Sequence, residues 1–242
     1  MSLLVYAILC LVLIFAGAGL AAFFDQSNRR KIVQGIQSLS GAFLFGILIL
    51  ELFPAIFKTH NHTIGIFVLI GFFLQIGIDV LTGGVEHGHI HFHEHNHKKS
   101  MLVSLFIGLG VHAVFDGLPF VGFMTGTDNH LHSVYTGILL HKIAEGFTLY
   151  LVMNLLGISR WRSIGLILVF AFLTPIGMYL IQKFPDLSST MSYILAFSGG
   201  SLLHVAITIL FESENLHHHG IAWRKLIWII AGIGLSILIV SV

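Results

Sequence analysis

The chain has 242 residues, of which 56% are hydrophobic and only 10% are charged. Soluble domains carry about 25% charged residues, so this composition excludes a soluble globular domain and indicates an integral membrane protein. The net charge of +1 gives no reason to expect a nucleic acid as a partner. The single cysteine, Cys10, cannot form an internal disulfide.

Eight apolar runs are each long enough to cross a bilayer, which takes about 20 mostly apolar residues. The first begins MSLLVYAILC, without a basic region or a cleavage pattern, so we interpret it as a retained helix. The short connections predict an all-α integral membrane fold, an eight-transmembrane-helix bundle in a single domain spanning residues 1–242. In chain order the runs cover residues 2–23, 33–57, 63–85, 101–125, 133–158, 161–182, 188–211 and 222–241.

The basic residues predict how this bundle sits in the membrane. Nine of the 12 lysines and arginines fall in the first, third, fifth and seventh loops, and two, Lys58 and Lys183, fall in the other loops. Lys142 lies inside the fifth run. Because basic residues concentrate in cytoplasmic loops, the odd-numbered loops are predicted to face the cytoplasm and both termini to be extracytoplasmic.

Residues 86–99, EHGHIHFHEHNHKK, form a histidine-rich loop between the third and fourth runs. Histidine-rich tracts bind transition metals. We favour metal capture on the cytoplasmic side over the alternative of a flexible polar linker. The HHH at residues 217–219 is equally compatible with metal binding and with an incidental cluster. The histidines of the loop are His87, His89, His91, His93, His95 and His97.

Two short motifs place a histidine and a carboxylate four residues apart inside the membrane. HAVFDG contains His112 and Asp116, and HKIAEG contains His141 and Glu145. Residues four apart share one face of a helix, and the fourth and fifth runs are antiparallel, so the two pairs are expected at matching depths near the midplane.

Ionisable residues at the bilayer centre cost at least about 2.5–3.5 kcal/mol each, and they usually mark a site or a pathway. Two imidazoles and two carboxylates suit a divalent transition metal such as Zn²⁺, with Fe²⁺ and Mn²⁺ as alternatives. The competing interpretation is four separate polar residues, each satisfied by hydrogen bonds between helices. Equal spacing and matching depth favour the metal site. Pro119 is expected to kink the fourth helix beside it.

These motifs and the predicted topology resemble the ZIP (Zrt/Irt-like) metal transporters. Members of that family have eight helices, both termini outside, a histidine-rich cytoplasmic loop between helices 3 and 4, and motifs of the HNxxDG and HxxxE kind in helices 4 and 5. HAVFDG and HKIAEG match these motifs, and SGAFLFGILILELFP in the second run also fits.

The resemblance implies a transporter, not an enzyme, that moves Zn²⁺ into the cytoplasm, with Fe²⁺, Mn²⁺ or Cd²⁺ as alternative substrates. It also implies that helices 4 and 5 carry the metal against a more static remainder of the bundle. The implied transport site consists of His112, Asp116, His141 and Glu145.

Three positions depart from the two-metal centre found in some members. Ala113 stands where those members have asparagine, and Lys142 stands where an acidic residue is common. Thr174 stands before Pro175, where some bacterial members have glutamate. We therefore predict a single-metal centre in which the Lys142 ammonium replaces the second cation. The alternative is a Lys142 side chain that extends away toward the membrane surface.

Other ionisable residues are candidates for the metal's route. Glu51 lies near the outer end of the second run, and His130 and His132 lie in the outer loop between helices 4 and 5. Each is equally interpretable as an interfacial or helix-packing residue. The candidates toward the cytoplasmic side are Asp79, His204 and Glu212.

Other function classes fit less well. An intramembrane zinc-dependent hydrolase, the main alternative, would need a glutamate base beside its first histidine, where this chain has Lys142. A cation-diffusion exporter usually has six spans and a soluble C-terminal domain, and a metal sensor would need a signalling domain. We expect a multi-pass protein of the plasma membrane, the inner membrane of a bacterium. The lipid bilayer and divalent metal ions are the expected partners, and a homodimer is one alternative for the oligomeric state.

Overall fold

The computed structural model describes residues 3–23, 26–58, 61–82, 98–122, 131–183, 187–211 and 219–241. These ranges contain helices and no strand, and eight helical stretches are long and apolar enough to span a membrane. The predicted eight-helix membrane fold is therefore confirmed. The spans are Leu3–Phe23, Gln34–Phe57, His62–Thr82, Leu102–Phe120, His132–Leu155, Arg160–Ile181, Ser189–Phe211 and Trp223–Val240.

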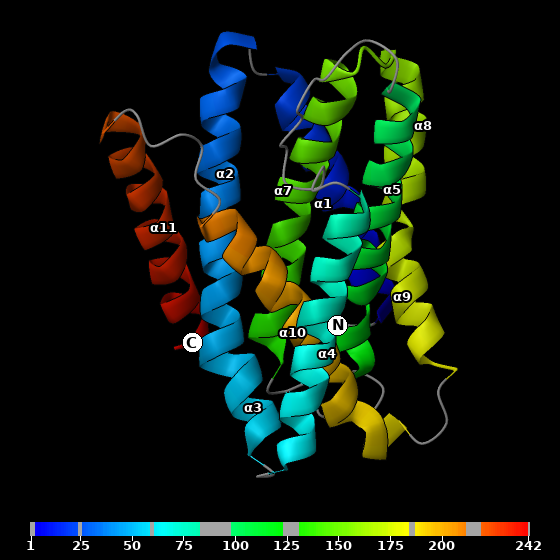
Figure 1. The fold of residues 1–242 in the computed structure, drawn as a ribbon, viewed down its shortest axis with the longest axis vertical. Coiled ribbons are helices and arrows are strands. Elements are labelled where there is room, and N and C mark those ends of the chain that lie inside the picture. Colours follow the sequence, from blue (N-terminus) through cyan, green and yellow to red (C-terminus); the bar gives the residue numbers. More distant parts are fainter. Residues whose placement is uncertain are drawn as a thin grey trace.

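The helices stand side by side as one bundle, with α11 beside α2 at one edge and α8 and α9 at the other (Figure 1). Their bounds are α1 Leu3–Phe23, α2 Gln26–Ile47, the π-helix η1 Leu48–Leu52, α3 Phe53–Phe57, α4 His62–Thr82, α5 Lys98–Phe115, the 3₁₀-helix η3 Leu118–Val121, α7 His132–Leu155, α8 Arg160–Ala171, α9 Leu173–Ile181, α10 Leu187–Phe211 and α11 His219–Val240.

Alternation of eight spans gives the bundle two distinct ends. The terminal end is where α1 begins and α11 ends, and the odd-loop end carries the first, third, fifth and seventh connections. That the odd-loop end faces the cytoplasm stays a prediction. The histidines of residues 86–97, His130 and Glu212 lie outside the described residues.

Prolines interrupt three of the spans, because proline has no backbone N–H to continue the helical hydrogen bonds. The span of α2 passes through η1 before Pro54, and α8 gives way to α9 before Pro175. The fourth span ends its α-helix at Phe115 and resumes as η3, which holds Pro119 in its first turn. The hydroxyl of Ser198 on α10 donates to the Phe115 carbonyl at 3.1 Å, supplying the hydrogen bond that Pro119 cannot.

Glycines let two pairs of helices approach backbone to backbone within one part of the bundle. A Cβ on Gly17 of α1 would overlap the Ile143 carbonyl of α7, and a Cβ on Gly146 of α7 would overlap α1 in return. Gly117 and Gly177 do the same between the end of the fourth span and α9. Small residues at such interfaces are the usual means of tight helix packing in membranes.

The remaining helices pack by the same device among themselves. Gly71 of α4 lies against the Phe197 carbonyl of α10, and Gly200 of α10 lies against the Val68 carbonyl of α4. Gly232 of α11 likewise leaves no room for a Cβ beside α2.

These contacts divide the bundle into two halves. The α7 half comprises α1, α5, α7, α8 and α9, and it encloses its own hydrophobic cluster, whose buried members come from α1, α5, α7, α8 and Leu156 directly after α7. The α10 half comprises α2, α4, α10 and α11. A second hydrophobic cluster joins the two halves and includes buried residues of α1, α2, α7 and α10. The interior of the α7 half is thus built separately from its boundary with the α10 half.

The glycine contacts predict unequal effects for two alanine substitutions on one helix. Gly71→Ala would place a Cβ against the Phe197 backbone, so α4 and α10 must separate, at a cost of about 1–3 kcal/mol of stability. Gly77→Ala is the matched control, because nothing lies within 4 Å of its added Cβ. Thermal unfolding of the purified protein in detergent measures both. Equal melting temperatures for the two variants would contradict this packing.

Candidate metal site

Two imidazole and two carboxylate side chains converge between the fourth span and α7. One ligand atom from each of His112, Asp116, His141 and Glu145 lies within 4.8 Å of the others. All four residues are buried, with exposed fractions of 1%, 0%, 3% and 5% in that order. The structure therefore brings together the two pairs that the sequence motifs predicted.

Helix geometry accounts for the two pairs. His112 lies in the last turn of α5, and the Asp116 amide still donates to the His112 carbonyl at 3.0 Å, so Asp116 completes that turn before the chain breaks. His141 and Glu145 lie one turn apart in the middle of α7. The break ahead of Pro119 leaves Asp116 at a helix end with Gly117 packed on α9.

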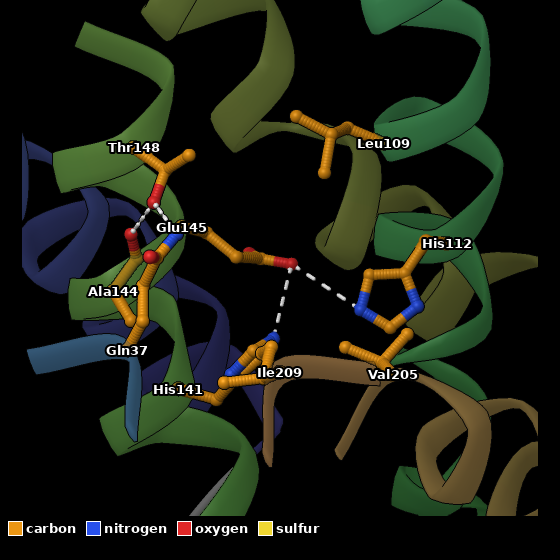
Figure 2. A pocket seen from close by; sticks show the side chains of 9 residues that line it. All are labelled: Gln37, Leu109, His112, His141, Ala144, Glu145, Thr148, Val205 and Ile209. Carbon is orange, nitrogen blue, oxygen red and sulfur yellow. Dashed lines mark hydrogen bonds and ion pairs between the residues drawn. The ribbon is translucent and has the colours of Figure 1, made fainter. Parts of the chain in front are cut away.

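The Glu145 carboxylate lies between the two imidazole rings (Figure 2). Its Oε1 is 3.5 Å from Nε2 of His112 and 3.8 Å from Nε2 of His141. Nε2 of His112 is also 3.4 Å from Oδ2 of Asp116, and the ring centroids of the two histidines are 5.9 Å apart. At these ion-pair separations the donor atoms face one point.

Lys142 lies inside the same cluster. Its side chain is 0% exposed, and its ammonium forms ion pairs with the Asp116 carboxylate and, at 2.6 Å, with Oε2 of Glu145. The side chain thus does not extend toward the membrane surface. It neutralises part of the charge of two carboxylates that the bilayer would otherwise disfavour strongly.

Two carboxylate oxygens in the cluster accept no hydrogen bond from the described residues. They are Oδ1 of Asp116 and Oε1 of Glu145, and both are buried. A buried acceptor without a donor is costly, whereas a coordinated cation would satisfy it. This donor set of two imidazoles and two carboxylates fits a divalent transition metal.

Residues outside the sequence motifs support the cluster from α2. The Ser40 hydroxyl lies 3.1 Å from Nδ1 of His141, and Gln37 donates to the Thr148 hydroxyl at 3.1 Å. Sequence reasoning missed these contacts. The available signal was weak, namely polar residues three positions apart in an apolar run, at Gln37 and Ser40 and again at Glu145 and Thr148.

A small cavity of about 40 Å³ reaches the cluster from one side (Figure 2). From the level of His112 it runs toward the start of α5, and from Glu145 it runs toward the end of α7. Both directions lead to the odd-loop end of the bundle. The lining residues are Gln37, Leu109, His112, His141, Ala144, Glu145, Thr148, Val205 and Ile209.

Aromatic side chains close the opposite side. Phe120 and Tyr135 stack at 4.8 Å between ring centroids, and Tyr6 meets them at 5.3 and 5.6 Å. None of the three is more than 5% exposed. They belong to the hydrophobic cluster that joins the two halves, so the halves are packed together at the terminal end, whereas the cavity lies between them toward the other end.

Two predicted route residues contact each other instead of the cavity. His204 on α10 and Asp79 on α4 form an ion pair at 2.5 Å, and Gln75 donates to the other Asp79 oxygen at 3.4 Å. Ser201 donates to Gln75 at 3.0 Å. Glu51 lies in the π-helix η1 and is not among the residues that line the cavity. The four motif residues are therefore brought together, whereas these candidates occupy separate places.

The fold and the cluster agree with one comparison. A family model described as ZIP Zinc transporter matches residues 84–240. The chain belongs to the ZIP family. The match contains all four clustered residues and extends from the histidine-rich loop to the end of α11. The family resemblance predicted from the sequence is therefore confirmed. ZIP proteins transport divalent metals across membranes and are not enzymes. No protein of curated function matches the chain.

The cluster predicts which substitutions weaken metal binding in the purified protein. His112→Ala or Glu145→Ala removes one donor from the four, and each is expected to lower zinc affinity at least about 100-fold, because the remaining donors leave the cation undercoordinated. His132→Ala is the control, since this exposed histidine at the start of α7 lies outside the cluster. Competition with a chromophoric chelator measures the affinity. Unchanged affinity in both donor variants would exclude this site.

Proposed function

We propose that this ZIP protein moves Zn²⁺ into the cytoplasm through a single-metal site formed by His112, Asp116, His141 and Glu145. Fe²⁺, Mn²⁺ and Cd²⁺ are the alternative substrates, because the same donors serve them. The observation that carries the proposal is the convergence of these four buried side chains at the inner end of a cavity. As expected from the sequence, we place the protein in a bacterial plasma membrane.

The charges of the cluster favour one metal over two. The carboxylates of Asp116 and Glu145 contribute two negative charges, and Lys142 contributes one positive charge. One divalent cation brings the total to +1, whereas two would bring it to +3 in a site with almost no water contact. Lys142 thus takes the place that a second cation has in two-metal members of the family.

The cavity and the loop charges together support transport into the cytoplasm. The cavity leads to the odd-loop end, which carries nine of the 12 basic residues and is therefore the predicted cytoplasmic end. On the other side of the site, buried apolar side chains of both halves pack around Phe120 and Tyr135. This arrangement corresponds to an inward-facing state, from which the metal leaves to the cytoplasm.

Transport further requires that the site face each side in turn. All four metal-binding residues and Lys142 belong to the α7 half, which is held together by glycine contacts and by a cluster of its own. We infer that this half moves as one body past the α10 half. Ser40, Gln37 and Ser198 contribute side-chain hydrogen bonds between the halves, and the movement would break and re-form them.

The remaining sequence candidates are assigned to the route. Glu51, in the second span beyond the closed end of the site, is placed on the entry side. The Asp79–His204 pair and Glu212 are placed near the cytoplasmic exit, where the histidine-rich loop would capture the released metal. A hydrolase is less compatible, because the position beside His141 that would need a base is held by Lys142 in its ion pairs.

A disulfide between the halves tests the movement. The Cβ of Ile47 on α2 lies 3.6 Å from the position of a Cβ on Gly137 of α7, within the range of about 3.5–4.5 Å for disulfides. In a Cys10→Ala background, Ile47→Cys with Gly137→Cys is expected to cross-link on oxidation and to stop at least about 90% of zinc uptake into proteoliposomes. Reduction is expected to restore uptake.

The single variants Ile47→Cys and Gly137→Cys serve as controls, and oxidation should leave their uptake unchanged. Uptake that persists after quantitative cross-linking would show that the halves need not move at this boundary. Absence of zinc uptake in the reduced double variant and in the parent protein would instead count against zinc transport itself.

The charge sum predicts the effect of removing the ammonium. Lys142→Met keeps the unbranched side chain, one atom shorter, and removes a positive charge close to the metal, so zinc affinity should rise at least about tenfold. The maximal uptake rate should fall, because the metal leaves more slowly. Lys183→Met, an exposed lysine outside the cluster, is the control. Equal or weaker zinc binding in Lys142→Met would contradict the role given to this residue.

A further inference from the structure

A metal-binding residue of one half is hydrogen-bonded to the other half. The Ser40 hydroxyl on α2 lies 3.1 Å from Nδ1 of His141 on α7. Both residues are buried, with exposed fractions of 4% and 3%. The contact therefore lies on the boundary between the α10 half and the α7 half, at the depth of the metal site.

The two nitrogens of the His141 ring face different partners. Nε2 faces Oε1 of Glu145 at 3.8 Å and belongs to the convergent cluster, whereas Nδ1 faces Ser40. A neutral imidazole carries its proton on only one nitrogen. If Nε2 is to offer its lone pair to a metal, Nδ1 must carry the proton, and its N–H then donates a hydrogen bond to the Ser40 oxygen.

We propose that Ser40 is a positioning residue for the metal substrate. Its hydroxyl holds His141 in the tautomer and ring orientation that present Nε2 to the cation. The proposal rests on the proposed function, since it gives His141 the role of a metal-binding residue. Hydrogen-bond partners of this kind typically contribute 10–100-fold to metal affinity.

The neighbouring contacts support a specific role over simple packing. Gln37, one turn earlier on α2, donates to the Thr148 hydroxyl, so two hydrogen bonds one turn apart hold α2 and α7 in register. An alanine at position 40 would fill nearly the same space, but it would leave Nδ1 of a buried imidazole without the contact seen here. The ring could then turn, and Nε2 would leave the metal position.

The register also ties this contact to the state of the transporter. Ser40 and His141 belong to different halves, so a displacement of the α7 half along α2 would separate them. The positioning described here therefore belongs to the arrangement in which the cavity reaches the odd-loop end.

Equilibrium zinc binding to the full-length protein tests the proposal. The six histidines of residues 87–97 are replaced by serine in every variant, so that the loop does not contribute. Ser40→Ala is expected to weaken zinc binding by about 10–100-fold. Ser38→Ala is the matched control, because this serine is also buried on α2, and its effect should stay within about threefold.

A double-mutant cycle separates positioning from a general loss of structure. In a His141→Ala background, Ser40→Ala is expected to cause no further loss, because the ring that it orients is gone. Losses that add in the double variant, or an affinity for Ser40→Ala equal to that of the parent, would overturn the role of Ser40. In both cases a weakened His141→Ala variant would leave the proposed metal site standing. If His141→Ala binds zinc like the parent, the site assignment and this inference both fail.

Discussion

The burial of two carboxylates inside a bilayer is the constraint on which the rest of this structure depends. Asp116 and Glu145 are at most 5% exposed, and a membrane interior gives no water to solvate them. The Lys142 ammonium, which pairs with both, offsets one of the two charges. The remaining negative charge and the carboxylate oxygens without a hydrogen bond favour a cation. The two buried carboxylates that cost the fold stability are therefore the groups that attract a metal ion.

The helix packing around this cluster serves its position. Glycines bring α1 against α7 and the end of the fourth span against α9, so backbone lies directly on backbone around the four clustered residues. The same device joins α4 to α10 in the other half. Each half thus gains rigidity from its own contacts, and the boundary between them consists of apolar side chains and a few hydrogen bonds.

That boundary explains why the site has one open side. At the terminal end, apolar side chains of both halves interlock around Phe120 and Tyr135. Toward the odd-loop end, a small cavity lies between the halves and reaches His112 and Glu145. A relative shift of the halves would open the packed end and close the end that now has the cavity. Such a change is required of a site that faces each side of a membrane in turn.

The sequence by itself determined the eight spans, the family and the four clustered residues, because a bilayer imposes a simple code. Span length follows from membrane thickness, and His112 with Asp116, or His141 with Glu145, must share a face at four-residue spacing. Only the tertiary structure decided what depends on the register between distant helices. It turned Lys142 onto both carboxylates, placed Ser40 on His141, and paired Asp79 with His204 away from the cavity. Apart from the Lys142–Glu145 pair, which lies on one helix, these contacts join side chains of different helices, and local spacing carries no information about the register between helices.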